Sequence, residues 1–321
     1  MLNPEIINKN IWNRLTKIHQ QNRASGAYLF IGSEKLGKFD LALDFIELGE
    51  GFENKRKLIE AGLHSDVIIV KPEIEEKKGK IKEKQISIEQ IQEALKEFSY
   101  FPQESQNKFL LINGVDKLTL SAANSLLKTI EELGENSVVI LTASGEGRVL
   151  ETIKSRCQKI YFNLKTEEEI KNFIEARNTD LNIDFLPKAD LKNTDLINDV
   201  VFLSRGRLKE AERLLKDEDY RKNRMEKLDV FRKALKGDLT TGFKIANEDT
   251  KDKRILEEYL MDWIYYLNSF LKQNVFEDKD LRVQKKVFQI LKQLNEAQEI
   301  LSSNKNVNSR VLLENFFVQI K

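Results

Sequence analysis

The sequence predicts an α/β domain built on a parallel sheet, followed by an all-helical region. Residues 1–163 contain short apolar runs of the kind that form buried parallel strands, and amphipathic segments separate these runs. The runs are AYLFI (27–31), VIIV (67–70), FLLI (109–112), VVIL (138–141) and IYF (160–162). From Lys165 onward, apolar residues recur at helical spacing instead. We therefore expect a sheet domain first and helices after it.

The helical half is expected to divide once more. Cuts near 164 and near 218 give three domains, 1–163, 164–218 and 219–321. Turn signals fall at Gly237-Asp238 and between Gln273 and Asp280, and no Pro/Gly/Ser-rich linker marks a flexible join.

Composition limits the classes of protein that fit. Lys and Arg number 53 against 52 Asp and Glu, a formal charge of +1, so no global basic field attracts nucleic acid, although a local basic face remains open. A single cysteine, Cys157, excludes an internal disulfide, and His19 and His64 are too few to complete a zinc site with it. No stretch approaches the about 18 apolar residues of a membrane helix. We expect a cytoplasmic protein without zinc and without membrane contact.

The stretch GSEKLGKF (32–39) follows the first apolar run and precedes an amphipathic helix, which is the context of a phosphate-binding loop. Gly32 and Gly37 would let backbone N–H groups approach phosphate, and Lys38 would reach the β- and γ-phosphates. Phe39 stands where a hydroxyl should hold magnesium. We expect impaired ATP or ADP binding at most, with no cofactor required.

The acidic residues of an active nucleotide hydrolase are also missing after the third apolar run. An active nucleotide hydrolase carries an acid there for the metal and an adjacent acid as base. Here Asn113 lacks the charge and Gly114 has no side chain, while Asp116 lies two residues beyond the base position. Together with Phe39, these losses all affect metal binding and hydrolysis, which indicates that this chemistry is not required.

The run PEIEEKKGKIKEK (72–84) is highly charged and shows no periodicity. We expect a solvated connection before the next helix, with contact to DNA or a partner as the alternative. Arg156, considered by itself, is better explained as the partner of a surface ion pair than as a functional residue.

Taken together, these stretches resemble the delta prime subunits of the bacterial DNA polymerase III clamp loader, a branch of the AAA+ family. The resemblance covers nearly the whole chain in the right order. The matching stretches are GSEKLGK, His64-Ser65-Asp66-Val67, ISIEQIQEALKEFSYFPQESQNKFLLI, ANSLLKTIEE, Ser155-Arg156-Cys157 and LSSNKNVNSRVLLENFFVQI. The resemblance implies an AAA+ P-loop-like domain over 1–163, a helical lid over 164–218 and a C-terminal collar over 219–321.

The resemblance also implies roles for single residues. Arg156 matches the arginine finger that such subunits insert into a neighbour's ATP site. Thr142 matches the position that senses the γ-phosphate, with the alternative that it simply ends a strand. Arg205 or Arg207 could face a nucleotide, although a helix start with exposed basic residues is the better expectation. The four zinc-binding cysteines common in the family have no counterpart here, so that segment is expected to be shortened or held by packing.

The implied function is that of a hydrolysis-deficient stator in the clamp loader. Its partners would be gamma/tau subunits and the delta subunit in a hetero-oligomeric ring, the sliding clamp, and primed template DNA through the complex. The aromatic stripe of residues 259–271 resembles a collar helix and is equally explained as plain core. Two alternatives remain: an active gamma/tau-type ATPase, and an AAA+ scaffold outside replication.

Overall fold

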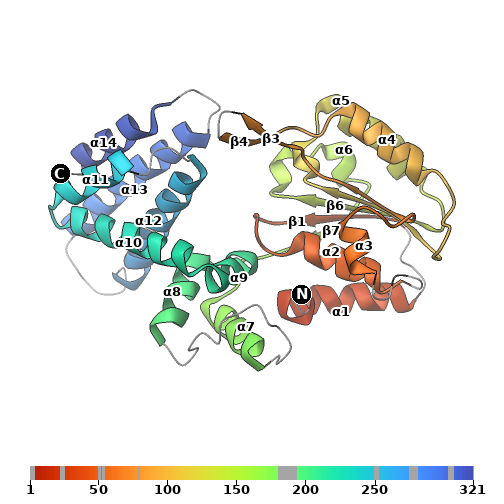
Figure 1. Ribbon diagram of the computed structural model, residues 1–321, viewed down its shortest axis with the longest axis horizontal. Helices are drawn as coiled ribbons and strands as arrows, with labels where there is room; N and C mark the ends of the chain where they lie inside the picture. Colours follow the sequence, from red (N-terminus) through yellow and green to blue (C-terminus); the bar gives the residue numbers. More distant parts are fainter. Residues whose placement is uncertain are drawn as a thin grey trace. The chain divides into compact units, whose positions relative to one another are not determined.

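The computed structural model describes residues 4–21, 26–49, 52, 55–77, 80–179, 194–248, 253–274, 281–302 and 307–320. The chain divides into two compact units, labelled by element in Figure 1. The sheet unit comprises Met1–Arg177 and Gly206–Glu210, and the helical unit comprises Asn178–Arg205 and Ala211–Lys321.

The sheet unit is built on a five-stranded sheet with the strand order β2-β5-β6-β1-β7. Its strands are β1 (Gly26–Ile31), β2 (Val67–Val70), β5 (Lys108–Asn113), β6 (Ser137–Ala143) and β7 (Gln158–Tyr161). All neighbouring pairs are parallel. Each strand overlaps one apolar run, although β7 begins two residues before the run at 160–162. The expected parallel sheet is therefore confirmed, and the carboxyl ends of its strands meet at one edge.

Helices cover both faces of this sheet (Figure 1). On one face lie α1 (Pro4–Gln20), α2 (Lys38–Glu47) and α3 (Arg56–Glu60), and on the other lie α4 (Ile88–Phe98), α5 (Leu120–Glu131) and α6 (Glu151–Lys154). Short turns η1 (Val115–Lys117) and η2 (Glu146–Arg148) follow β5 and β6, and α7 (Glu167–Thr179) follows β7. Ser87 begins α4 with a capping box, since its side chain accepts the Gln90 N–H while Gln90 accepts the Ser87 N–H.

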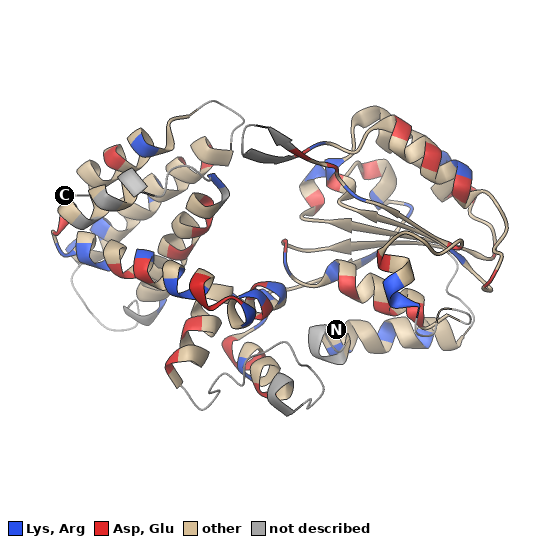
Figure 2. Ribbon diagram, in the orientation of Figure 1, with Lys and Arg blue, Asp and Glu red and all other residues tan. Residues whose placement is uncertain are grey.

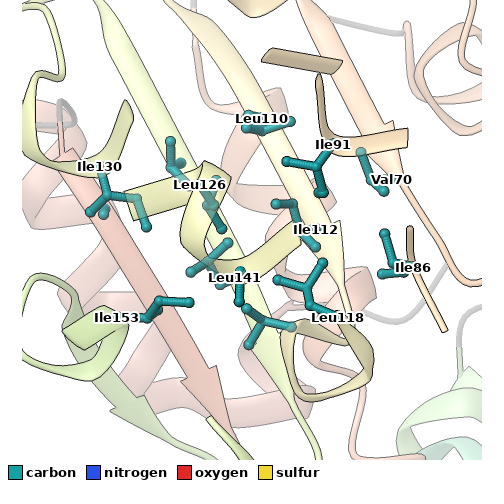
Figure 3. Close-up of a cluster of buried hydrophobic side chains, with 14 of the residues drawn as sticks. Val70, Ile86, Ile91, Leu110, Ile112, Leu118, Leu126, Ile130, Leu141 and Ile153 are labelled. Carbon is teal, nitrogen blue, oxygen red and sulfur yellow. The ribbon is translucent and has the colours of Figure 1, made fainter. Parts of the chain in front are cut away.

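A hydrophobic core fills the space between the sheet and α4 to α6 (Figure 3). Ile91 of α4, Leu126 of α5 and Ile153 of α6 are buried against β5 and β6. Because these apolar residues recur at helical spacing, each helix buries one face and leaves its charged face in solvent. Figure 2 shows the outcome: charges of both signs alternate along the helices, and the sheet strands carry few.

The charged run 72–84 differs from the expectation of an irregular connection. It forms an antiparallel pair of strands, β3 (Ile74–Lys77) and β4 (Lys80–Glu83). Lys117 forms an ion pair at 2.6 Å with Glu83, the last residue of β4. Backbone pairing between the two strands stabilises a segment whose side chains give no apolar alternation.

The segment that lacks the family's cysteines is held in part by a buried arginine. Arg56 of α3 forms ion pairs with Asp44 at 2.7 Å, Glu47 at 2.9 Å and Glu60 at 2.9 Å. Burial raises the pKa of Asp44 to about 6, although Arg56 opposes this shift. These contacts fix α3 against α2; residues 50, 51, 53 and 54 lie outside the described residues.

The helical unit contains α8 (Thr194–Ser204), most of α9 (Leu208–Lys216), α10 (Glu218–Leu235), α11 (Leu239–Glu248), α12 (Lys253–Asn274), α13 (Leu281–Ser302) and α14 (Ser309–Gln319). Its core centres on Trp263, which stacks on Phe231 with ring centroids 4.7 Å apart. The expected turn at Gly237 separates α10 from α11. The second turn was expected between Gln273 and Asp280, but α12 continues to Asn274. Residues 275–280 lie outside the described residues.

The fold class is therefore the expected one, a P-loop parallel-sheet unit of AAA+ type with a helical remainder. Among the helices that the structure describes, none combines the length and apolar character needed to cross a membrane.

Candidate functional site

The loop between β1 and α2 has the geometry that its glycines require. Gly37 has φ 85°, in the left-handed region, and caps the N-terminus of α2. At Gly32 any side chain would collide with the carbonyl oxygen of Phe162, and the Gly32 N–H donates to Ala143 O at 3.2 Å. Since the first N–H groups of a helix have no partner within it, this loop and helix start form a setting that favours anions.

Lys38, the first residue of α2, folds back over the loop. Its Nζ donates to Gly32 O at 2.5 Å and to Ser33 O at 2.6 Å, and the side chain is buried. Burial lowers the pKa of Lys38 to about 8; Glu34 and Asp116 oppose this shift and Lys117 adds to it. The ammonium group is therefore held at the loop and desolvated.

A cavity of about 400 Å³ opens beside this loop at the carboxyl edge of the sheet. Three groups of residues line it: Gly37 and Lys38 of the loop, Asn113 and Asp116 after β5, and Thr142 at the end of β6. The structure thus brings together four of the expected positions, Gly37, Lys38, Asn113 and Thr142, whereas Gly32, at the start of the loop, is not among the residues that line the cavity.

The polar groups at the ends of β5 and β6 bind one another. Thr142 Oγ1 donates to Asn113 Oδ1 at 2.8 Å and accepts the Gly114 N–H at 3.0 Å. Asp116 Oδ2 accepts hydrogen bonds from the N–H and hydroxyl of Ser144. The other carboxylate oxygen of Asp116 is buried and accepts no hydrogen bond within the described part of the chain.

The residues of the cavity fit a phosphate better than they fit magnesium. The Phe39 ring lies under the Lys71 ammonium, with Nζ 4.6 Å from the ring centroid, and offers no oxygen ligand. Asn113 supplies an amide oxygen in place of a carboxylate. Within the described ranges, no three or more His, Cys, Asp or Glu side chains gather as a metal site would require.

The start of α9 contributes a cation that sequence reasoning missed. The Lys209 N–H donates to Lys35 O at 3.0 Å, and Lys209 Nζ lies 2.8 Å from Asp40 Oδ1. Lys35 Nζ in turn lies 2.7 Å from Glu210 Oε2, whose side chain is fully buried. Lys209 lines the cavity. A lysine in a helix's first turn opposes the helix dipole, which is the signal that could have singled it out.

Arg205 and Arg207 behave differently from the expectation. Arg205 was expected either to face a nucleotide or to be an exposed helix start, and both expectations are wrong: it is buried in the helical unit. There it pairs with Glu258 and lies 3.6 Å from Asp262, which also binds the buried Arg224 at 2.6 Å. Arg207 is partly buried and is not among the residues that line the described cavity.

Arg156 lies outside the cavity, just after α6. Its Nε lies 2.6 Å from Glu131 Oε1, and its Nη1 donates to Thr152 O at 3.1 Å and to Ser155 Oγ at 3.3 Å. The side chain is 39% exposed. Neighbouring Cys157 is partly buried, and burial raises the pKa of its thiol to about 12, so the thiol stays protonated.

The sheet order, the glycine loop at its carboxyl edge and the helical remainder define a P-loop protein of AAA+ type. A family model described as "DNA polymerase III, delta subunit" matches residues 7–166. The DNA polymerase III subunit delta' of Bacillus subtilis is 36% identical over 171 residues, which cover 50% of this chain and 47% of that protein. By these matches the chain belongs to the clamp-loader subunit family of DNA polymerase III, on its delta prime branch.

Two further relatives extend the likeness over most of the chain. Subunit delta' of Pseudomonas aeruginosa is 23% identical over 278 residues, covering 82% of this chain and 78% of that protein. A DNA polymerase III gamma-subunit-related protein of Thermotoga maritima has the same fold, with a TM-score of 0.54 at 18% identity over 95% of this chain and 98% of that one. In the first three curated relatives the matched part spans 47%, 24% and 29% of their length, so about half or less.

Proposed function

We propose that this chain is the hydrolysis-deficient stator of a DNA polymerase III clamp loader. In this role it places Arg156 in the ATP site of a neighbouring gamma/tau subunit while the ring loads a sliding clamp onto primed DNA in the cytoplasm. Its other ring partner would be a delta subunit. The observation that carries the proposal is a contrast: the cavity beside Lys38 lacks groups for metal and water activation, and Arg156 is retained on the exposed surface.

The proposal assigns the cavity no hydrolysis of its own. Gly32, Gly37 and Lys38 keep the loop suited to phosphate, and Thr142 is paired with Asn113. Gly114 leaves the attacking water without a base, and Phe39 leaves a metal without its hydroxyl ligand. ATP or ADP would bind weakly, through phosphate contacts, and would not be turned over. Thr142 then serves to order the ends of β5 and β6.

Arg156 suits action on another molecule. It lies outside the chain's own cavity, is 39% exposed, and keeps Nη2 without a partner in the described part of the chain. A guanidinium supplied in trans offsets the charge that develops on the transferred phosphoryl group. The chain's own contribution to the reaction is therefore to hold this cation at a fixed place.

The proposed architecture has three domains, a P-loop-like domain over 1–163, a lid over 164–218 and a collar over 219–321. Within the helical unit, the packing of α10, α12 and α14 around Trp263 supports an independently stable collar. Tyr266 and Phe270 are only partly buried on that core, which leaves apolar surface for a neighbouring collar. DNA would be reached through the assembled ring.

One observation favours an alternative, an active gamma/tau-type ATPase. Asp116 keeps a buried carboxylate oxygen without a hydrogen bond in the described residues, and it lines the same cavity as Lys38. An unusual metal site would need such an oxygen. Magnesium-dependent hydrolysis by the isolated chain would favour this alternative over the stator.

The test is an Arg156→Ala variant in the reconstituted loader with gamma/tau and delta subunits, clamp and primed DNA. Because removal of an arginine finger costs about 10³-fold or more in turnover, the ATP site that Arg156 completes should lose about that much. Pre-steady-state phosphate release and clamp loading measure it. Arg148→Ala, at another exposed arginine of the same unit, is the control. Full DNA-stimulated ATPase and clamp loading by Arg156→Ala would refute the proposal.

A further inference from the structure

We propose that Glu131 is the positioning residue for Arg156: its carboxylate fixes the guanidinium so that one corner, Nη2, is presented to the neighbouring subunit. This inference rests on the proposed function and adds to it a residue that acts through Arg156 and does not itself touch ATP.

The contacts of Arg156 engage two of its three nitrogens. Nε lies 2.6 Å from Glu131 Oε1, in an ion pair. Nη1 donates to two groups of its own segment, Thr152 O and Ser155 Oγ. Within the described part of the chain, Nη2 donates no hydrogen bond. A planar guanidinium held at two positions has its third position fixed as well, so the open corner points in one direction.

Glu131 occupies a place that its own helix disfavours. It is the last residue of α5, and Glu132 follows it as the C-cap. The carbonyl end of a helix carries partial negative charge, so two acids there cost stability, and cations are preferred. The described residues offer Glu131 one cationic partner, Arg156. An acidic residue at an unfavourable helix position that has one specific partner indicates a functional role.

Both side chains are mounted on the same rigid core. Leu126 and Ile130 fix α5 on the sheet, and Ile153, which is 1% exposed, fixes α6. Cys157 packs against the same cluster directly after Arg156. Placing catalytic and supporting groups on such elements, and locking their rotamers by hydrogen bonds, is what holds a site to within about 0.5 Å.

The ion pair does little for folding, because its two side chains are 39% and 47% exposed. Its expected effect is on turnover at the neighbouring site. Loss of an exposed ion pair corresponds to about fivefold at most, and a catalytic group displaced by about 1 Å costs about 100-fold. We expect Glu131→Ala to lower kcat of the completed ATP site about tenfold, with KM unchanged.

The experiment has one arm on the isolated chain and one on the complex. In the isolated chain, the Arg156 guanidinium should rotate slowly in the native protein, as measured on its side-chain ¹⁵N resonances, and Glu131→Ala should speed this rotation. In the reconstituted loader, kcat and KM are measured for Glu131→Ala, Glu131→Gln and Arg156→Ala. Glu132→Ala is the matched control, because it removes the same charge from the adjacent residue, which is exposed.

The expected results distinguish the positioning role of Glu131 from the proposed function on which it rests. Glu131→Gln should keep an intermediate kcat, because its amide keeps a polar contact beside Nε without the charge, and Glu131→Ala should add nothing in an Arg156→Ala background. If Arg156→Ala fails but Glu131→Ala keeps full kcat, or the slow rotation of the guanidinium survives Glu131→Ala, the positioning role is wrong and the stator stands. If Arg156→Ala keeps full activity, the proposed function itself fails.

Discussion

The cavity beside Lys38 and the segment around Arg156 belong to the same sheet unit, and their charged groups are arranged in different ways. At the cavity, three of the lysines that line it have carboxylate partners: Lys35 has Glu210, Lys209 has Asp40, and Lys117 has Glu83 and Glu34. At Arg156, the single carboxylate of Glu131 leaves one guanidinium nitrogen open.

The two sites therefore differ in what they offer to a phosphate or a metal. A ligand entering the cavity must compete with internal ion pairs and finds no carboxylate at position 113 or hydroxyl at position 39 to hold a metal. In the proposed function, a phosphate approaching Arg156 meets a side chain that is 39% exposed and whose Nη2 donates no hydrogen bond within the described residues. The phosphate loop keeps its geometry, whereas the proposed reacting cation is Arg156.

The largest effect on the cavity side is expected from Gly32→Ala. The new Cβ would collide with the carbonyl oxygen of Phe162, a backbone atom that cannot swing aside. We expect a loss of about 3 kcal/mol in the free energy of unfolding of the sheet unit, at the upper end for overpacking. Gly147→Ala, where a Cβ meets open space, should stay within about 0.5 kcal/mol. Urea unfolding followed by circular dichroism measures both, and equal stabilities would mean that the loop is not a required scaffold.

A gain of metal dependence is the next largest effect. The double variant Phe39→Ser, Asn113→Asp supplies a hydroxyl and a carboxylate at the metal positions, and the new carboxylate can still accept the Thr142 hydroxyl. We expect Mg²⁺ to tighten ADP binding by about tenfold in this variant and to leave the native chain unchanged. Gly114 still provides no base, so no hydrolysis should appear. Calorimetric titration with and without Mg²⁺ tests this, and an unresponsive double variant would show that more than two residues block the metal.

The smallest effect is a pH dependence of phosphate binding through Lys38. Its pKa is lowered to about 8, so its charge is present below that pH and is lost as pH rises through it. ADP binding without metal should therefore weaken by up to about tenfold between pH 7 and pH 9. Burial alone would lower the pKa of Lys117, but Glu83 and Glu34 outweigh it and raise that pKa, so Lys117 stays charged. Lys38→Ala should remove the dependence, and a dependence that persists in it would assign the titration elsewhere.

Much of the fold could be predicted from the sequence, because each strand of the five-stranded sheet contains or overlaps an uncharged apolar run. The glycine loop could also be predicted, because a strand directly precedes it and a helix directly follows it. The hairpin of Ile74–Lys77 with Lys80–Glu83 was missed, because backbone pairing forms it without an apolar face.

The parts that could not be predicted depend on contacts between residues far apart in the chain. Lys209 reaches the cavity through Lys35 and Asp40, and Arg205 is buried by Glu258 and Asp262. Glu131 and Arg156 are 25 positions apart, and their pairing needs α5 and α6 on one core. Spacing along the sequence carries none of this information.

The most direct test of the central claim is a titration of the purified chain with a fluorescent ATP analogue, with and without Mg²⁺, combined with a phosphate-release assay on the same preparation. We expect weak binding at most, no strengthening by Mg²⁺, and no phosphate released. Phosphate release that requires Mg²⁺ and disappears in Lys38→Ala would contradict it, and would make this chain a motor subunit.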